Sequence, residues 1–180
     1  MAFNVTEFRA NLLGDGARPN LFQVSLTFPT VANSPVAGQR LSFLAKTAQL
    51  PGSTVGTVPM YYFGREMKFA GNRTFPDWSI TIINDEDFNV RNAFEKWSDA
   101  INSHSLNVRN PAAYNQLLYT TDATVTQFSK AGLPIKSYKF VGLFPTDVSP
   151  IELDWGSNDS IEEFGVTLAY QFWESDTTSY

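Results

Sequence analysis

The chain has 180 residues, with 13 Lys and Arg against 18 Asp and Glu, so its formal net charge is −5 at pH 7. This length fits one domain that buries its own core, and the absence of cysteine excludes disulfides, thiolate metal sites and cysteine nucleophiles. Only 17% of the residues are charged while 43% are hydrophobic, which favours a subunit whose surface is partly covered by other protein.

The start of the chain, Met1 to Glu7, has neither a basic segment nor an apolar stretch, so we expect no secretory signal. Ala2 excludes N-myristoylation, and no apolar run approaches the roughly 18 residues that cross a bilayer. We therefore expect synthesis in the cytoplasm and no membrane anchor. Residues 1–180 are expected to form a single domain, with loose ends at 1–14 and 175–180.

Three segments alternate between apolar and polar residues as half-buried strands do, namely 21–28, 78–82 and 166–172. Such alternation favours antiparallel sheet with one face on the core. Weaker strand candidates are 41–50, 59–70, 117–128 and 136–144. Proline and glycine predict a loop over 29–41 and a second loop around Leu50 to Met60.

One of the weaker strands has an unusually polar face. Between Tyr119 and Gln127, this face is made of Thr120, Asp122, Thr124 and Thr126, and the opposite face is only moderately apolar. A strand of this kind keeps its β-branched propensity, but its polar side cannot be buried in a core. We expect that side to contact water or a wet interface.

One helix is predicted by an apolar stripe at positions i, i+4, i+7 and i+11, formed by Val90, Phe94, Trp97 and Ile101. The acidic residues 85–87 favour a helix start, because negative charge stabilises the positive end of the helix dipole. We expect an amphipathic helix over 86–102 that packs on a sheet.

Charge is unevenly distributed along the chain. Residues 1–139 hold all 13 basic residues and 10 acids, for a charge of 13 − 10 = +3, whereas residues 140–180 hold 8 acids and no base, for −8. Internal neutralisation within one fold is one interpretation. The other is a subunit with an acidic and a weakly basic face, which suits copies that stack head to tail.

The residues offer no recognisable catalytic or metal site. The one histidine, His104, could form a triad with Asp99 and Ser103 or Ser105, but no Gly-x-Ser-x-Gly motif accompanies it, so we expect an exposed loop histidine. The acidic run from Asp154 does not fit an EF-hand, because Asp159 stands where glycine is required. We therefore expect no catalytic residue, no metal and no cofactor.

Binding of nucleic acid by a basic surface is disfavoured as well, because the chain is acidic and its Lys and Arg are dispersed. The aromatic residues could form a platform for carbohydrate. However, Trp78 and Trp97 lie on predicted core faces, so packing accounts for them better. The residues by themselves direct attention to assembly.

Three blocks resemble a known family in order and spacing. They run from Ala17 to Val24, from Ala70 to Glu86, and from Gly142 to Val148 with continuations at Leu153 to Trp155 and Phe164 to Ala169. Together they resemble the tail tube protein family of contractile-tailed bacteriophages of the T4 type, over roughly residues 15–174.

The resemblance implies a mainly β fold of two packed antiparallel sheets, a barrel-like sandwich, with one flanking helix. It implies a structural virion protein of the phage tail, not an enzyme, assembled in the host cytoplasm into six-membered rings that stack into a hollow tube. The implied partners are other copies of the chain, the sheath protein, the baseplate tube-initiator and tail terminator proteins, the tape measure protein, and then double-stranded DNA in the lumen without sequence-specific binding.

Two sets of residues become candidates on that basis. For contacts between rings they are Leu50, Val55, Val58, Asp147, Asp154 and Glu162, and for the lumen they are Thr120, Asp122, Thr124 and Thr126. A tube initiator or an injection-system tube subunit of the same fold remains an alternative. A different class, a monomeric aromatic β-sandwich that binds glycans, also remains open.

Overall fold

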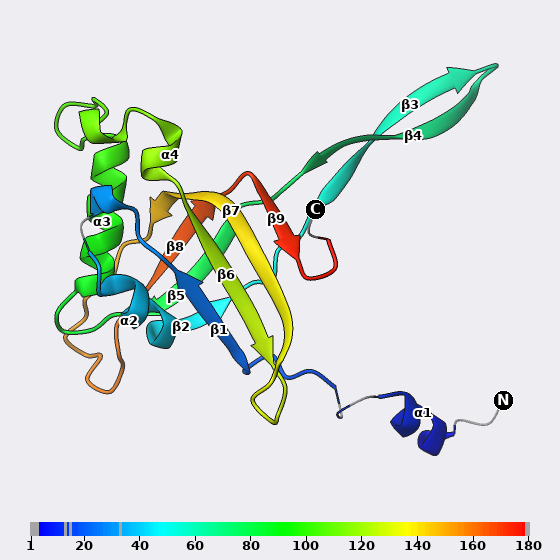
Figure 1. Cartoon of the computed structure of the whole chain (residues 1–180), viewed down its shortest axis with the longest axis horizontal. Helices are drawn as coiled ribbons and strands as arrows, with labels where there is room; N and C mark the ends of the chain where they lie inside the picture. Colours follow the sequence, from blue (N-terminus) through cyan, green and yellow to red (C-terminus); the bar gives the residue numbers. More distant parts are fainter. Residues whose placement is uncertain (1–3, 13, 15, 33, 179–180) are drawn as a thin grey trace.

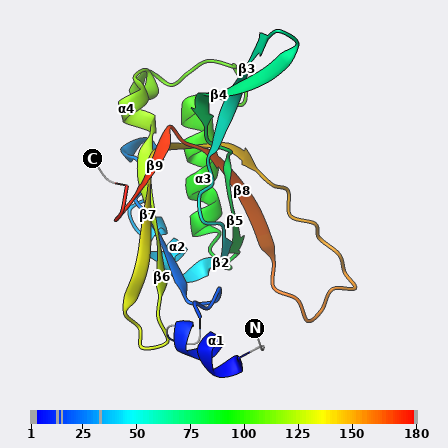
Figure 2. The same cartoon turned by 90° about the vertical axis from the view of Figure 1, so that its right-hand side faces the viewer.

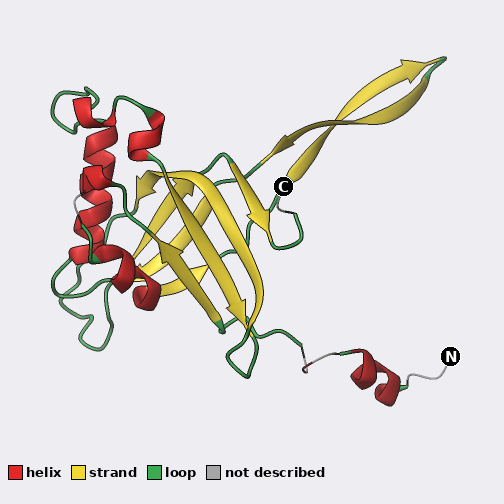
Figure 3. Cartoon of the chain, in the orientation of Figure 1, coloured by secondary structure: helices red, strands yellow, loops and turns green. Residues whose placement is uncertain are grey.

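Strand β7 (Pro134–Val148) joins two layers of antiparallel sheet in the computed structural model, which describes residues 4–12, 14, 16–32 and 34–178. Its first part pairs with β6 and β9, and its last part pairs with β8. The first layer has the order β1-β6-β7-β9 and the second β7-β8-β5-β2 (Figure 1). The other strands are β1 (Phe22–Leu26), β2 (Ala45–Ala48), β5 (Trp78–Ile83), β6 (Thr121–Phe128), β8 (Glu163–Ala169) and β9 (Phe172–Ser175). The mainly β fold of two packed sheets is confirmed (Figure 3).

Gly142 forms the corner at which β7 passes from one layer to the other. Val141 is the last residue paired with β9, and Phe144 is the first paired with β8. Between them Gly142 has a φ of +69°, and its N–H donates to Asp122 Oδ1 at 3.1 Å. A Cβ atom here would lie 2.9 Å from Cγ of Gln171. Glycine is therefore required by both the conformation and the space.

The hydrophobic core fills the space between the two layers. Trp78 of β5 stacks on Phe140 of β7, with ring centroids 4.4 Å apart, so one aromatic pair connects the layers. The indole N–H of Trp78 donates to the Gln49 carbonyl at 2.8 Å, which satisfies its polar atom. Around this pair Val24, Leu26, Ile80, Ile82, Val166 and Leu168 are buried, as the alternation predicted. Phe172, expected on the same face as Val166 and Leu168, is instead 41% exposed, because β8 ends at Ala169 and Phe172 begins β9.

The predicted helix is α3 (Asn89–Ile101), which begins three residues later than expected and stands along one side of the strands in Figure 1. The delay arises because Phe88 adopts a left-handed φ of +51°, so the chain turns at residues 86–87 before the helix begins. Val90, Phe94 and Trp97 are buried, which confirms the apolar stripe. The Trp97 indole N–H donates to the Tyr119 carbonyl at 2.6 Å.

The prediction of a loop over 29–41 and a strand over 41–50 is wrong in part. A 3₁₀ turn, η2 (Thr30–Ala32), and a second helix, α2 (Ala37–Leu44), occupy the segment, and only β2 remains as strand. Helix α2 packs so closely on β1 that a Cβ atom at Gly38 would lie 2.5 Å from the Leu26 carbonyl oxygen. Only glycine fits at this contact. Arg40 also holds it in place through ion pairs with Asp85 at 2.7 Å and Asp87 at 2.9 Å.

Other boundaries also differ from those expected. Residues 54–60, expected within a flexible loop, instead belong to a hairpin of β3 (Thr54–Tyr62) and β4 (Arg65–Thr74). The segment 117–128 begins as a short helix, α4 (Gln116–Tyr119), after the 3₁₀ turn η3 (Pro111–Ala113). The segment 136–144 is the middle of the longer β7.

Both expected loose ends contain regular structure where they are described. Helix α1 (Val5–Asn11) lies apart from the strands in Figure 1, and its N-terminus is capped by the Asn4 side chain, which accepts from the Thr6 N–H at 3.1 Å. Ser175, at the other end, is the buried last residue of β9. Residues 1–3, 13, 179 and 180 lie outside the described part of the chain.

Replacing Gly142 by Ala should destabilise the fold by about 1–2 kcal/mol, because a side chain in the left-handed region is strained and the Gln171 side chain must move. The matched control is Gly165→Ala in β8, where the nearest atom would be Ser149 Oγ at 3.5 Å, an ordinary contact. Urea unfolding monitored by tryptophan fluorescence measures both. Equal unfolding midpoints for the two variants would contradict the role of Gly142 as the corner.

Candidate functional site

His104 lies on the exposed loop after α3. Its Nδ1 is 3.4 Å from Asp99 Oδ1, and its side chain is 71% exposed. The hydroxyls of Ser103 and Ser105 lie 3.4 Å from each other, and within the described residues neither bonds to the imidazole. A nucleophile needs a base within hydrogen-bond reach, so this loop offers no catalytic unit.

Within residues 4–12, 14, 16–32 and 34–178, no three His, Asp or Glu side chains are grouped so that they could hold a metal ion. In the same residues no helix is both long enough and apolar enough to span a membrane. Trp78 and Trp97 are buried in the core, so neither can form the sugar-binding platform considered above.

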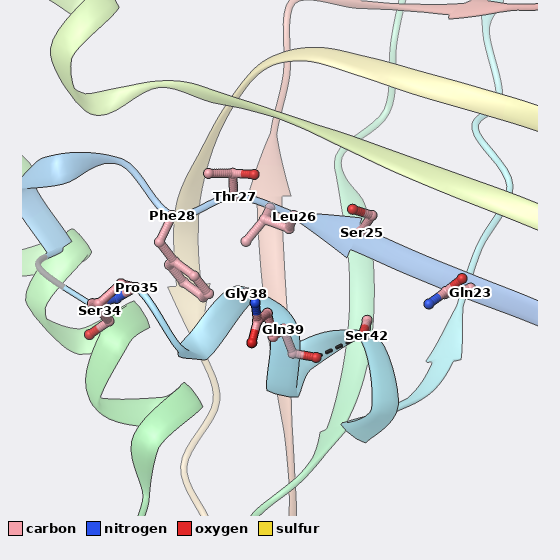
Figure 4. Close-up of a pocket in the computed structure, with 10 residues that line it drawn as sticks. All are labelled: Gln23, Ser25, Leu26, Thr27, Phe28, Ser34, Pro35, Gly38, Gln39 and Ser42. Carbon is pink, nitrogen blue, oxygen red and sulfur yellow. Dashed lines mark hydrogen bonds between the residues drawn. The ribbon is translucent and has the colours of Figure 1, made fainter.

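A cleft of about 380 Å³ lies between β1 and α2 (Figure 4). Its polar lining comes from Gln23 and Ser25 on one side and Gln39 and Ser42 on the other. The Ser42 hydroxyl donates to the Gln39 carbonyl at 2.7 Å. None of the lining residues ionises, so the cleft has no acid, base or charged group with which to anchor a substrate.

The hairpin, residues 54–74, extends away from the strands and is almost entirely exposed (Figure 2). Residues paired across two antiparallel strands share a face. One face therefore carries Val58 with Phe69 and Met60 with Met67. At the tip, Phe63 and Gly64 have φ values of +46° and +78°, as a two-residue type I′ turn requires. Phe63 is 92% exposed, so the tip presents an uncovered aromatic group.

The three apolar candidates for ring contacts lie on or near this hairpin. Val55 and Val58 are on β3, and Leu50 precedes it on the segment from β2. All three are exposed. The base of the hairpin is fixed by the Trp173 indole, whose N–H donates to the Gly52 carbonyl at 3.0 Å. The hairpin is thus anchored at its base, and its apolar side chains remain exposed.

A second projecting segment, residues 149–162, connects β7 to β8, and we refer to it as the acidic loop. It carries four carboxylates and no base, for a charge of −4. Its apolar side chains are also uncovered, with Leu153 80% and Trp155 100% exposed. The loop borders an open hollow of about 730 Å³. Exposed aromatic and aliphatic groups beside carboxylates are typical of a protein-binding surface.

The three acidic candidates do not form one group. Asp154 is on the acidic loop, where its carboxylate accepts from the Gly156 N–H at 3.0 Å. Glu162 closes that loop and accepts from the Asn84 amide at 2.9 Å. Asp147 lies instead on β7, paired with Thr167, in a hollow shared with α3. The three residues are close in the sequence and were therefore expected to act together. Strand pairing places Asp147 away from Asp154 and Glu162.

The polar face of β6 continues across the first layer as a polar surface. Thr124 pairs with Ser25 on one side and Lys139 on the other, and Lys139 pairs in turn with Glu174 of β9. Thr126 pairs with Gln23 and Ser137, and its hydroxyl lies 3.1 Å from the Ser137 hydroxyl. Thr120 precedes β6, and its hydroxyl donates to the Gln116 carbonyl at 2.9 Å. The sequence indicated that β6 contributes polar residues to such a surface. The strand order shows that β1, β7 and β9 contribute polar residues to it as well.

Lys139, the cation among the residues named on this surface, is neutralised in place by Asp122. Its ammonium lies 2.9 Å from Asp122 Oδ2, and Asp122 is itself held by the Gly142 N–H. The hydrogen bond and charge of Asp122 raise the pKa of the Lys139 ammonium above its ordinary value. The surface therefore presents hydroxyls and amides with compensated charge, rather than a free cation.

Comparison with known proteins identifies relatives along nearly the whole chain. The family model described as phage tail tube protein matches residues 17–176. The chain is 36% identical over 169 residues to tail tube protein gp19 of Enterobacteria phage T4, which covers 92% of this chain and 96% of that protein. It is 29% identical to the tail tube protein of Serratia phage KSP90, with 92% and 93% covered.

Solved structures share the fold. A chain in the tube-terminating cap of the anti-feeding prophage superposes with a TM-score of 0.63 at 18% identity, covering 91% of each chain. A chain in the sheath-tube complex of the PVC extracellular contractile injection system gives 0.55 at 17% identity, covering 97% and 99%. Because the family model spans most of the sequence and the match covers 96% of the T4 protein, this chain belongs to the phage tail tube protein family.

Proposed function

We propose that this chain is the structural subunit of a phage tail tube, a virion component rather than an enzyme. Six copies close into a ring, and rings stack into a hollow tube inside a contractile sheath. The observation that carries the proposal is the hairpin. An isolated two-stranded hairpin is at best marginally stable in water, and this one leaves both faces and its apolar side chains exposed in the single chain. Contact with further copies would cover it.

Ring closure has a physical basis in the edges of the sheets. Strands β1, β2 and β9 each have one paired neighbour within the described residues, so one edge of each has no strand partner. An unpaired edge presents a row of backbone donors and acceptors to another chain. A contact between two different edges of identical subunits is heterologous. Such a contact closes into a ring when the rotation that relates one subunit to the next is a whole fraction of a full turn.

The polar surface of the first layer supports a role as lining of the lumen. DNA has to slide through a conduit, and free Lys or Arg side chains would bind its phosphates. A surface of threonine, serine and glutamine, with Lys139 neutralised by Asp122, offers hydrogen bonding without a free cation. We infer that Asp122, Thr124 and Thr126 line the lumen, and that Thr120 contributes less because it precedes the strand.

The partners follow from this assignment. Structures of the same fold occur in the baseplate and the tube-terminating cap of the anti-feeding prophage and in the sheath-tube complex of an extracellular contractile injection system. By analogy we propose the tail sheath protein, a baseplate tube initiator and a tail terminator as neighbours of the assembled tube. The lumen is proposed to hold a tape measure protein first and double-stranded DNA later, with no recognition of DNA sequence.

Electron microscopy of the purified chain tests the proposal. We expect rings and tubes of uniform diameter, because uncovered apolar surface and unpaired edges both favour association. Addition of a baseplate nucleus should increase the fraction in tubes if assembly starts slowly. A chain that stays monomeric with and without the nucleus would contradict the proposal. Retention of that monomer on a polysaccharide column would favour a glycan-binding module instead.

Tubes assembled from Thr124→Lys subunits should retain double-stranded DNA at about 50 mM salt and release it near 200 mM, because contacts between cations and phosphates weaken steeply with salt. Unmodified tubes should not retain it. DNA ejection from phage carrying the variant should be slower. The matched control is Thr120→Lys, which adds the same charge before β6. Ejection kinetics unchanged by Thr124→Lys would show that this face does not line the lumen.

A further inference from the structure

The hairpin forms a small sheet of its own. Strands β3 and β4 pair with each other, and among the described residues neither pairs with a strand of the two layers. Backbone pairing therefore does not set the direction in which the hairpin projects. That direction depends on the contacts of its base, by which we mean residues 49–53 and 75–77, the segments that connect the hairpin to β2 and β5.

Two indole N–H groups donate to backbone carbonyls of the base. Trp78 donates to Gln49 at 2.8 Å, and Trp173 donates to Gly52 at 3.0 Å. Trp78 follows the base directly in the chain and is buried in the core, so its position is fixed with the core. Trp173 instead comes from β9, 121 residues beyond Gly52 in the sequence. The base of the hairpin therefore depends on the position of β9, which lies beside the start of β3 in Figure 1.

Strand β9 is secured along one edge. Its four residues pair with β7, and in the part of the chain that the structure describes no strand pairs with its other edge. The strand ends in a turn, where the Thr178 N–H donates to the Ser175 carbonyl at 3.0 Å. A short edge strand opens locally more easily than a strand that is paired on both sides. Pairing with another copy at the free edge would therefore hold β9 more firmly.

The Trp173 side chain lies between β7 and the base of the hairpin. It shares the core face of the sheet with the buried Phe140, because the two residues pair directly across β9 and β7. Its ring meets that of Tyr138 edge to face, with centroids 5.6 Å apart. Next to it is a hollow of about 360 Å³ bordered by Arg73 and Phe75 among others. This open space gives the base room to shift, so the hydrogen bond from Trp173 is what restrains it on this side.

We propose that Trp173 is a positioning residue that couples pairing at the free edge of β9 to the direction of the hairpin. The inference rests on the proposed function, because this edge is paired when copies assemble. Pairing orders β9, β9 holds the indole, and the indole restrains the base of the hairpin. The coupling is reciprocal, since two events that favour the same arrangement also favour each other. A subunit whose hairpin is already correctly directed therefore joins other copies at a lower concentration.

Distances between two spin labels test the positioning role. Because the chain has no cysteine, labels can be attached at Tyr61→Cys on the exposed hairpin and Ser79→Cys on β5. In dilute, unassembled subunits Trp173→Phe should broaden the distribution of distances, since it removes the indole N–H and keeps an aromatic ring. The matched control is Trp97→Phe, which removes an indole N–H that bonds to the Tyr119 carbonyl, and its distribution should stay narrow. Equal distributions in the two variants would overturn the positioning role.

Assembly of the same two variants tests the coupling. Sedimentation gives the lowest subunit concentration at which rings or tubes form. Trp173→Phe should raise this concentration by roughly twofold to tenfold, the factor expected for loss of one hydrogen bond. Trp97→Phe should leave it unchanged. Urea unfolding of both variants checks that the effect does not arise from a general loss of stability, and Trp173→Tyr replaces Trp173→Phe if the latter does not fold.

The outcomes separate this inference from the proposed function. A broader distance distribution together with a higher assembly concentration supports the coupling. A broader distribution with an unchanged concentration overturns the coupling, and an unchanged distribution overturns the positioning role as well, while the tube function stands in both cases. A natural chain that remains monomeric under every condition overturns the proposed function and the coupling with it.

Discussion

The sharing of β7 between two layers is the constraint on which the structure depends. A 15-residue strand that pairs first with β6 and β9 and then with β8 has to turn without losing its ladder, and Gly142 makes the turn. The turn orients Phe140 toward the core, where it stacks on Trp78. The same corner fixes Asp122 through the Gly142 N–H, so core packing and the polar surface share one backbone feature.

The apolar side chains and indole N–H groups of the core find their contacts within the subunit. The segments that project from the subunit leave apolar side chains uncovered. Buried indoles find backbone acceptors, and the apolar faces of the strands and of α3 cover one another. The hairpin, the acidic loop and α1 instead leave Phe63, Trp155 and Phe8 exposed. Exposed apolar groups of this size, gathered on extensions rather than scattered singly, indicate surfaces that other protein covers. A chain whose surface is partly covered by other protein needs fewer charged residues, which agrees with the low share of charged residues in this sequence.

Electrostatics divides the molecule into surfaces with different tasks. On the polar surface, Lys139 is matched by Asp122, so charge is neutralised where we propose that DNA passes. On the hairpin, Arg65, Lys68 and Arg73 form no ion pair with a carboxylate among the described residues, so this projection keeps a charge that another copy can match. A salt bridge between exposed groups adds little stability. The arrangement therefore matters for what each surface attracts more than for how firmly the chain folds.

The sequence by itself determined the features that depend on local pattern. Alternation identified the strands around Val24, Ile80 and Val166, the stripe through Phe94 and Trp97 identified α3, and motif order identified the family. Tertiary structure alone decided the rest. Helix α2 forms where Gly38 permits close packing on β1, and the hairpin projects because its strands pair only with each other. Asp147 is separated from Asp154 by strand pairing. Such features depend on how segments pair and pack in three dimensions, which local periodicity does not encode.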